Sequence, residues 1–159
     1  MREVPLTQGQ VAIIDDEDYE RVMQHKWCAL FNDGIWYAVR AIRVGNKKSL
    51  QQMHRFILEV QRGDRREVDH KDHNGLNNQK ENLRVCTHAQ NMQNCRMFHG
   101  RSKYRGVMWY KITGRWLSSI RIQGKSVFQG YFTTQEQAAM AYDLAALTHY
   151  GQYACTNFF

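Results

Sequence analysis

An adjacent acid and imidazole, followed by two spaced amides, are the residues of this sequence whose types could do chemistry together. Asp69 directly precedes His70, Asn82 follows His70 by twelve positions, and Asn91 follows Asn82 by nine. A neutral imidazole can take a proton from water near neutral pH. A carboxylate and an amide oxygen suit a hard divalent cation such as Mg²⁺. The pattern indicates a metal-dependent hydrolytic centre, with His70 as general base and Asp69 and Asn91 as metal ligands.

The elements that must position these side chains are short. The run 65–68 predicts a strand that ends at the Asp-His pair, and a polar loop with Asn74-Gly75 leads to a second run from Asn82. A helix is expected over 87–98, and it carries Asn91. Because strand residues alternate between faces, we expect the first strand to end or distort where Asp69 and His70 meet. The Asn82 amide can tie the intervening loop to backbone.

This stretch resembles the HNH, or ββα-metal, nucleases, in particular the phage and intron-homing type in which the last His is replaced by Asn. The likeness covers about residues 50–98 and includes the flanks Val68-Asp-His-Lys-Asp, Asn82-Leu-Arg and Asn91-Met-Gln-Asn. The resemblance implies one divalent ion, Mg²⁺ or Mn²⁺, held by Asp69 and Asn91. It also implies that His70 is the general base and that Asn82 braces the loop.

Four further residues are weaker candidates for the centre. His73 lies in the loop, where it could assist the leaving group or simply face solvent. His88 precedes Asn91 by three positions and shares its helix face. His54 and Arg55 open an expected helix, 54–60, where they could lie near the phosphate backbone or pack on the core. The alternative for the whole motif is a polar, Asn-rich loop.

Composition favours a polyanionic partner. The 159 residues carry a net charge of +7, and residues 101–159 contribute 7 Lys+Arg against 2 Asp+Glu. The four cysteines show no Cys-x-x-Cys pair, so free thiols in a reducing compartment are expected. A zinc site from Cys86, His88, Cys95 and His99 is an alternative whose spacing fits no common finger.

Residues 1–53 predict a β-rich entry segment. A short apolar strand, 11–14, runs into an acidic block, 15–20, that favours a helix start over about 16–24. The block could also hold a metal ion, although it lacks the glycine and spacing of a calcium loop. Asn32-Asp33-Gly34 between two apolar runs is a strong hairpin signal. We expect no signal peptide and no membrane span.

The last third predicts three strands and a helix. The strands are expected over 104–110, 115–122 and 125–132, with turns at Thr113-Gly114 and Gln123-Gly124. Thr134-Gln-Glu-Gln137 is a capping box for a helix that reaches about Tyr150. An apolar stripe is expected on that helix at Ala138, Ala141, Tyr142, Ala145 and Thr148.

This region resembles the plant ethylene-response-factor (APETALA-type) DNA-binding domain, through Ser102-Lys-Tyr-Arg-Gly-Val, Trp116, Gly130-Tyr-Phe, Ala141-Tyr-Asp and Asn157-Phe. The resemblance implies that a three-stranded sheet enters the major groove. It implies DNA contacts from these positions of the sheet: Arg105, Trp109, Arg115, Trp116 and Arg121. Met108 and Ser126 stand where plant members carry Arg, so the plant target does not transfer. Alternatively, Trp116 is a core residue under the sheet.

We therefore expect an α+β chain in three parts: a β-rich segment over 1–53, an HNH nuclease core over 54–99 and an ethylene-response-factor-like domain over 100–159. The leading hypothesis is a site-specific HNH endonuclease acting on double-stranded DNA. We expect it to be cytoplasmic in a bacterial or phage-infected cell and to nick as a monomer, with a homodimer for double-strand breaks. The alternatives are a DNA-binding regulator with an inactive nuclease domain and, less favoured, an RNA-binding module.

Overall fold

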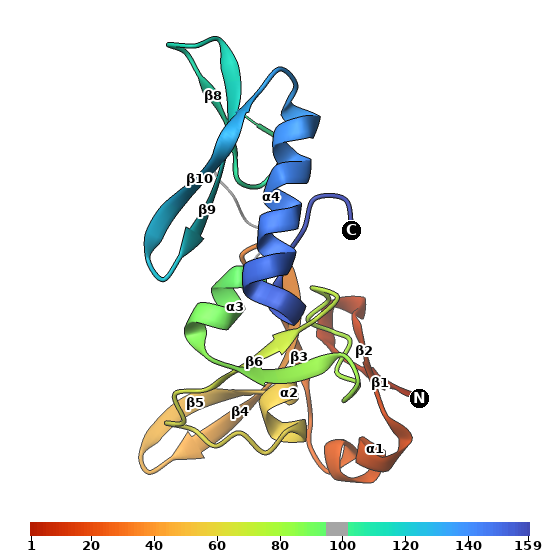
Figure 1. Ribbon diagram of the computed structural model, residues 1–159. Helices are drawn as coiled ribbons and strands as arrows, with labels where there is room; N and C mark the ends of the chain where they lie inside the picture. Colours follow the sequence, from red (N-terminus) through yellow and green to blue (C-terminus); the bar gives the residue numbers. More distant parts are fainter. Residues whose placement is uncertain (95–101) are drawn as a thin grey trace. The chain divides into compact units, whose positions relative to one another are not determined.

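The computed structural model describes residues 1–94 and 102–159, which form two compact units, Met1–Asn91 and Met92–Phe159 (Figure 1). Both units mix helices with small antiparallel sheets, so the predicted α+β class is confirmed. The expected helix end at Phe98 and the Cys95 and His99 of the zinc alternative lie outside the described residues. No helix in the described ranges has the length and apolar character needed to cross a bilayer.

The first unit begins with a hairpin of β1 (Arg2–Pro5) and β2 (Val11–Ile14), joined through the 3₁₀ turn Thr7–Gly9. The acidic block then starts α1 (Asp16–Met23), as predicted. Its acids bind cationic and backbone groups of the protein. Asp16 pairs with Arg2, and Asp15 accepts a hydrogen bond of 2.7 Å from the Lys80 backbone N–H. The block therefore supports the loop that follows the Asp-His pair.

A three-stranded sheet follows, built from β3 (Cys28–Asn32), β4 (Ile35–Val44) and β5 (Lys47–Gln52). The predicted hairpin at Asp33-Gly34 is confirmed, and both turn residues have positive φ (48° and 83°), as a two-residue hairpin turn requires. The next helix, α2 (Met53–Ile57), is shorter than the expected 54–60. It ends early because Glu59 has a φ of 55°, which a helix cannot continue through.

The stretch with the Asp-His pair forms a strand, a loop, a strand and a helix: β6 (Glu67–His70), β7 (Leu83–Cys86) and α3 (His88–Asn94). β6 starts later than the expected run 65–68, because Asp64 accepts from the Arg66 backbone N–H and from its guanidinium and so closes a local turn. Thr87 and Gln90 exchange hydrogen bonds at the start of α3 in a capping-box arrangement.

Residues 1–53 and the strands of the Asp-His stretch share one hydrophobic core. Its buried members come from β1, β2, α1, β4, α2, β6, β7 and the connecting segments: Val4, Ala12, Ile14, Val22, Trp27, Ala38, Met53, Ile57, Val60, Val68 and Leu83. The loop between β6 and β7 also lies along β2, where Ile13 N–H donates to Leu76 C=O and Ile13 C=O accepts from Asn78 N–H. The β-rich segment therefore scaffolds the candidate centre. The three-part division itself stays a prediction.

The second unit is a sheet of order β10-β9-β8 with one long helix against it. Its elements are β8 (Val107–Tyr110), β9 (Arg115–Ile122), β10 (Lys125–Phe132) with a bulge at Gln129, α4 (Gln135–Tyr150) and the 3₁₀ turn Gly151–Tyr153. The capping box at Thr134 and Gln137 is confirmed. The first strand begins at Val107 rather than Tyr104, since Gly106 has a φ of 73°.

The stripe that packs α4 against the sheet differs in part from the expected one. Ala138, Tyr142 and Ala145 are buried as predicted, together with Ala139 and Ala146. Thr148 is exposed, and its hydroxyl donates to the Leu144 carbonyl within the helix. The expectation for Thr148 was wrong, because the last buried residues of the helix are Ala145 and Ala146 and Thr148 lies outside the face that they form.

Candidate functional site

Asp69 and His70 lie on opposite faces of β6. They are the last two residues of the strand, with Asp69 opposite Arg84 and His70 opposite Leu83 on β7. β6 ends at His70, so the expectation that the strand ends at this pair is confirmed. Alternation gives the two side chains different surroundings: Asp69 shares its face with Glu67, and His70 shares its face with Val68. Both Asp69 and His70 are buried, with 7% and 6% of their surface exposed.

His70 sits in a buried polar cluster. Its ring centre is 4.8 Å from that of His54 and 6.2 Å from that of Tyr37. His70 Nε2 lies 3.5 Å from Asn78 Oδ1, while Asn78 Nδ2 donates to the Leu76 carbonyl. That second bond fixes the amide so that its oxygen faces the ring, which favours the His70 tautomer with the proton on Nε2. Nδ1 then carries the lone pair that a general base needs.

Burial lowers the pKa of His70 below its ordinary value of 6.5, against the opposing effects of the Asn78 hydrogen bond and the charges of Asp72 and Asp69. Burial, then the charges of His70 and Arg55, hold the pKa of His54 well below 6.5. Both rings are therefore neutral at neutral pH. Neutrality is the state in which an imidazole can accept a proton from water.

The structure places His54 and Arg55 in supporting positions. His54 is 4% exposed, and its Nε2 lies 3.2 Å from Gln52 Oε1. Arg55 donates to the backbone carbonyls of Arg66 (2.9 Å) and Gln61 (2.8 Å), so it ties the 61–66 loop to α2.

Asn82 braces the loop between β6 and β7. Its Oδ1 accepts from the Asp72 backbone N–H (3.1 Å), and its Nδ2 donates to Asp72 Oδ1 (2.9 Å) and the Asn77 carbonyl (2.8 Å). Burial raises the pKa of Asp72, but the hydrogen bonds from Asn74, Asn77 and Asn82 outweigh it and lower the pKa overall. The carboxylate is thus the ionised hub of the loop. His73 is half-buried in the same loop with a φ of 64° and donates its backbone N–H to the His70 carbonyl.

Asp69 forms a buried ion pair with Arg84. Asp69 Oδ2 accepts from Arg84 Nη2 (2.6 Å) and Nε (2.8 Å), and both side chains are about nine-tenths buried. Such a charge-assisted pair is strong because water does not screen it. The negative charge of this region also affects Cys86. Burial first, then the charges of Asp69 and Glu67, raise the pKa of its thiol to about 11.

Asn91 and His88 converge on Glu67, the residue two positions before Asp69. Asn91 Nδ2 donates to Glu67 Oε2 (2.6 Å), and His88 Nδ1 lies 2.8 Å from Glu67 Oε1. Burial raises the pKa of Glu67, but the hydrogen bonds from Asn91 and His88 lower it overall. Glu67, Asn91 and His54 also line a cavity of about 340 Å³ that is bordered by Tyr37, Gln52 and Arg55.

The donor atoms on this face of β6 fit a hard divalent cation in type. Asp69, Glu67 and the Asn91 amide supply carboxylate and carbonyl oxygens, which Mg²⁺ and Mn²⁺ prefer. No cluster of three His, Cys, Asp or Glu side chains suited to a metal occurs in residues 1–94 and 102–159. A site here would therefore rest on few protein ligands, and the Arg84 guanidinium competes for the same Asp69 oxygen.

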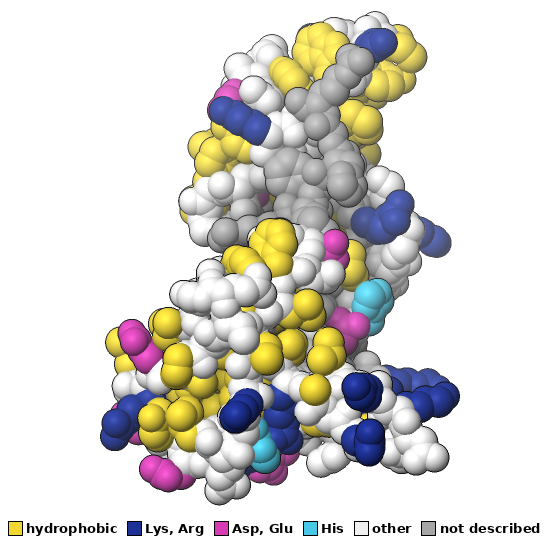
Figure 2. Space-filling model, turned by 180° about the vertical axis from the view of Figure 1, so that it is seen from behind, with side chains coloured by type: hydrophobic (Ala, Val, Ile, Leu, Met, Phe, Trp, Pro, Cys, Tyr) yellow, Lys and Arg dark blue, Asp and Glu magenta, His cyan; other side chains and the backbone are white. Residues whose placement is uncertain are grey.

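In the second unit, the predicted DNA-contacting residues divide between two faces of the sheet. Arg115 and Arg121 are exposed on the face away from α4. Trp116 is half-buried and packs against Val107 and Ala138 on the helix side of the sheet, which favours its alternative as a core residue. The residues on the open face beside the arginines include Met108, Tyr110, Ser119, Phe128 and Tyr131. Several are apolar and exposed, and Figure 2 shows hydrophobic side chains gathered at this end of the chain.

Trp109 and Arg105 are also placed apart from that basic face. Trp109 lies opposite Trp116 across the strands and packs edge-to-face on it, with ring centres 5.1 Å apart, while 39% of its surface stays exposed. Arg105 donates its backbone N–H to Asn157 Oδ1 (2.7 Å) and its Nη2 to the Met92 carbonyl (3.1 Å). Direct opposition to Trp116 fixes Trp109 on the helix side, whereas its neighbours Met108 and Tyr110 lie on the face of Arg115.

Three residues of the candidate site were missed by the sequence reasoning. Arg84 lies in the quoted Asn82-Leu-Arg flank, and its position opposite Asp69 follows once the hairpin register is known. Glu67 could have been found by alternation, since residues 67 and 69 share a face. Asn78 carried no such signal: its contact with His70 depends on the path of a twelve-residue loop.

Comparison with known proteins adds two separate likenesses. A family model described as HNH endonuclease matches residues 51–93. An AP2-like ethylene-responsive transcription factor of Arabidopsis thaliana is 49% identical over 61 residues, 37% of this chain and 18% of that protein. APETALA2-like protein 2 of Oryza sativa subsp. indica is 51% identical over 57 residues, 36% of this chain and 13% of that protein. The chain spans less than a fifth of the length of these relatives.

Proposed function

We propose that this protein is a metal-dependent DNA endonuclease of the HNH kind, in which the first unit cuts and the sheet of the second unit binds double-stranded DNA. The observation that carries the proposal is the Asp-His pair at the end of β6, with Asn91 bonded to Glu67 on the Asp69 face of that strand, within the residues that match the HNH endonuclease family model. The loop brace by Asn82 has the form that the sequence pattern predicts, which supports the same reading.

The roles follow from the surroundings of each side chain. His70 Nδ1 takes a proton from the attacking water, and Asn78 holds the ring in the tautomer that leaves this nitrogen basic. Asp69 and Asn91 hold one divalent ion, Mg²⁺ or Mn²⁺, with Glu67 orienting the Asn91 amide. When bound, that cation supplies charge stabilisation for the leaving oxygen. Asn82 keeps the loop closed around Asp72, next to the base.

DNA delivery is assigned to the open face of the β8–β10 sheet. Arg115 and Arg121 are exposed there, and a sheet of this width can enter the major groove, where Arg can bond guanine edges with two hydrogen bonds. The names of the plant relatives describe transcription factors, which supports DNA as the partner of this unit. One active site per chain handles one strand, so a monomer nicks.

The second candidate function is a DNA-binding regulator whose nuclease unit is inactive. Two observations favour it: the Asp69 carboxylate is already engaged by Arg84, and His70 is 6% exposed. In that case the first unit would be a scaffold with the residues of a nuclease and no cation.

A plasmid assay separates the two candidates. We expect purified protein to convert supercoiled plasmid to the relaxed form with Mg²⁺ or Mn²⁺ and to leave it intact in EDTA. His70→Ala and Asp69→Asn should each abolish relaxation while plasmid binding persists. Asp33→Asn, at an exposed hairpin turn that also tolerates Asn, is the matched control and should cut normally. Binding without relaxation under any divalent ion would favour the regulator.

A further inference from the structure

A second basic region lies in the first unit, in addition to the C-terminal one. Residues 35–66 carry 8 Lys+Arg against 2 Asp+Glu, whereas residues 1–34 carry 3 against 7 and residues 67–91 carry 3 against 4. The positive charge of the first unit is therefore concentrated between β4 and the start of β6. In Figure 2, Lys and Arg side chains gather at the lower right, on the side to which the β4–β5 hairpin projects.

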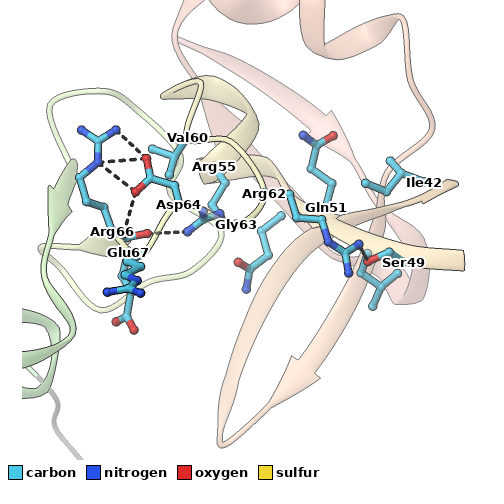
Figure 3. Close-up of a pocket in the computed structure, with 13 residues that line it drawn as sticks. Ile42, Ser49, Gln51, Arg55, Val60, Arg62, Gly63, Asp64, Arg66 and Glu67 are labelled. Carbon is cyan, nitrogen blue, oxygen red and sulfur yellow. Dashed lines mark hydrogen bonds and ion pairs between the residues drawn. The ribbon is translucent and has the colours of Figure 1, made fainter. Parts of the chain in front are cut away.

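These charges border a groove between β5, α2 and the 61–66 loop (Figure 3). The groove has a volume of about 480 Å³ and four arginines in its lining, Arg55, Arg62, Arg65 and Arg66. Arg62 reaches across it to the Ser49 hydroxyl on β5. The two acids in the lining are Asp64 and Glu67.

The arginines of the groove outnumber its acids by four to two. Hydrogen bonds from the Arg66 side chain and backbone lower the pKa of Asp64 to about 2, so Asp64 stays ionised, and its ion pair is with Arg66. Arg55 donates to carbonyls and Arg62 to a hydroxyl, neither of which carries charge. Within residues 1–94 and 102–159, Arg65 is exposed and makes no ion pair. The groove therefore has an excess of two positive charges, four arginines against two acids.

The groove leads to the candidate centre. Gln52, Arg55 and Glu67 line both the groove and the cavity that holds His54 and Asn91. A DNA strand that lay along the groove would therefore lead to Glu67. The Oε2 atom of Glu67 accepts a hydrogen bond from Asn91.

We propose that this groove binds the phosphodiester backbone of double-stranded DNA next to the scissile bond, with Arg62 and Arg65 as the phosphate contacts. The inference rests on the proposed function for the identity of the polymer, and it places a second DNA-binding site on the nuclease unit. Arg55 is a positioning residue, since its two bonds to the 61–66 loop hold Arg62 and Arg65 at the groove. Because phosphate contacts carry no sequence information, this site contributes affinity and register.

The test is the salt dependence of duplex binding by the full chain. Each arginine that neutralises a phosphate contributes about 0.9 to the slope of log Kd against log salt. Arg62→Gln and Arg65→Gln should each lower the slope by about 1, lower affinity on the order of tenfold at 0.1 M salt, and act equally on all duplex sequences. Arg2→Gln is the matched control, since it removes the same charge from the N-terminal hairpin, where Arg2 pairs with Asp16. It should leave the slope unchanged.

Binding is measured independently of cleavage, so the endonuclease proposal and the groove proposal can each be refuted without the other. A protein that never cuts but shows the slope change would refute the endonuclease and retain the groove. Slopes for Arg62→Gln and Arg65→Gln equal to that of Arg2→Gln would overturn the groove. If Arg62→Gln and Arg65→Gln lost affinity for an RNA duplex but not for a DNA duplex, the assignment to DNA would be overturned. If millimolar inorganic phosphate displaced the duplex from the wild-type protein, the groove would be a small-anion site instead.

Discussion

At the residue scale, the chemistry of the centre depends on the partner of each ionisable side chain. Asp69 Oδ2 lies 2.6 Å from Arg84 Nη2, and the pair is shielded from water. A cation bound by Asp69 would take the place of the guanidinium as the source of positive charge. Arg84 is then either the residue that holds the carboxylate in position until a cation and DNA arrive or the residue that blocks the site. Its removal distinguishes the two roles.

Replacing Arg84 by Gln should lower the free energy of unfolding by about 3 kcal/mol, because it leaves a buried carboxylate without its ion pair. Urea titration measures this loss. If Asp69 binds a cation, Mn²⁺ should restore more stability to Arg84→Gln than it adds to the wild type. The double variant Asp69→Asn/Arg84→Gln is the control: it should recover most of the lost stability and show no response to Mn²⁺.

The His54–His70 pair predicts a pH-dependent stability. Both pKa values lie below 6.5 in the folded protein, so below pH 6.5 the unfolded chain binds protons that the folded chain does not. The unfolding free energy should therefore fall as the pH drops from about 7 to 5, by up to about 1.4 kcal/mol per pH unit for each histidine. Thermal unfolding of His54→Asn should show about half of this dependence. An equal decline in the variant and the wild type would contradict the assignment.

At the element scale, local signals in the sequence predict much of the fold. The turn at Asp33-Gly34, the capping box at Thr134 and the strands 115–122 and 125–132 each rest on neighbouring residues, and the structure has them where expected. What could not be predicted depends on contacts between distant residues. The faces taken by Trp109 and Trp116 follow from the strand register, and the Asn78 contact follows from how the loop packs on β2.

The glycine before β8 gives a test of how closely α4 approaches the sheet. Gly106 and Gly114 both have positive φ, 73° and 61°, so Ala at either position costs about 1 kcal/mol in backbone strain. A Cβ at Gly106 would also lie 1.9 Å from the Tyr142 ring, whereas a Cβ at Gly114 would have no neighbouring atom of the described residues within 4 Å. Gly106→Ala should therefore destabilise the second unit by more than 3 kcal/mol, and Gly114→Ala by about 1. Tryptophan fluorescence during urea unfolding measures both, and equal losses would mean that α4 packs less tightly than described.

At the scale of the whole molecule, the two units have separate hydrophobic cores and separate basic surfaces. The first unit packs around Val4, Ile14, Met53 and Leu83, and the second packs around Ile120, Tyr142 and Ala146. Separate cores predict that each unit folds without the other. Separate basic surfaces predict that DNA affinity is divided between them, with sequence selection in the unit that carries Arg115 and Arg121.

Deleting residues 101–159 tests that division of labour. The remaining chain should keep its far-ultraviolet circular dichroism and still nick plasmid with Mg²⁺ or Mn²⁺, but at higher protein concentration and with less preference among sites. Its salt slope should fall by about 2, one for each of the two arginines lost from the open sheet face, while the contribution of Arg62 and Arg65 remains. An unchanged slope would place the DNA-binding surface in the first unit alone. Loss of all binding would mean that the arginine groove does not hold DNA without the sheet, because a groove with two phosphate contacts should retain measurable affinity at low salt.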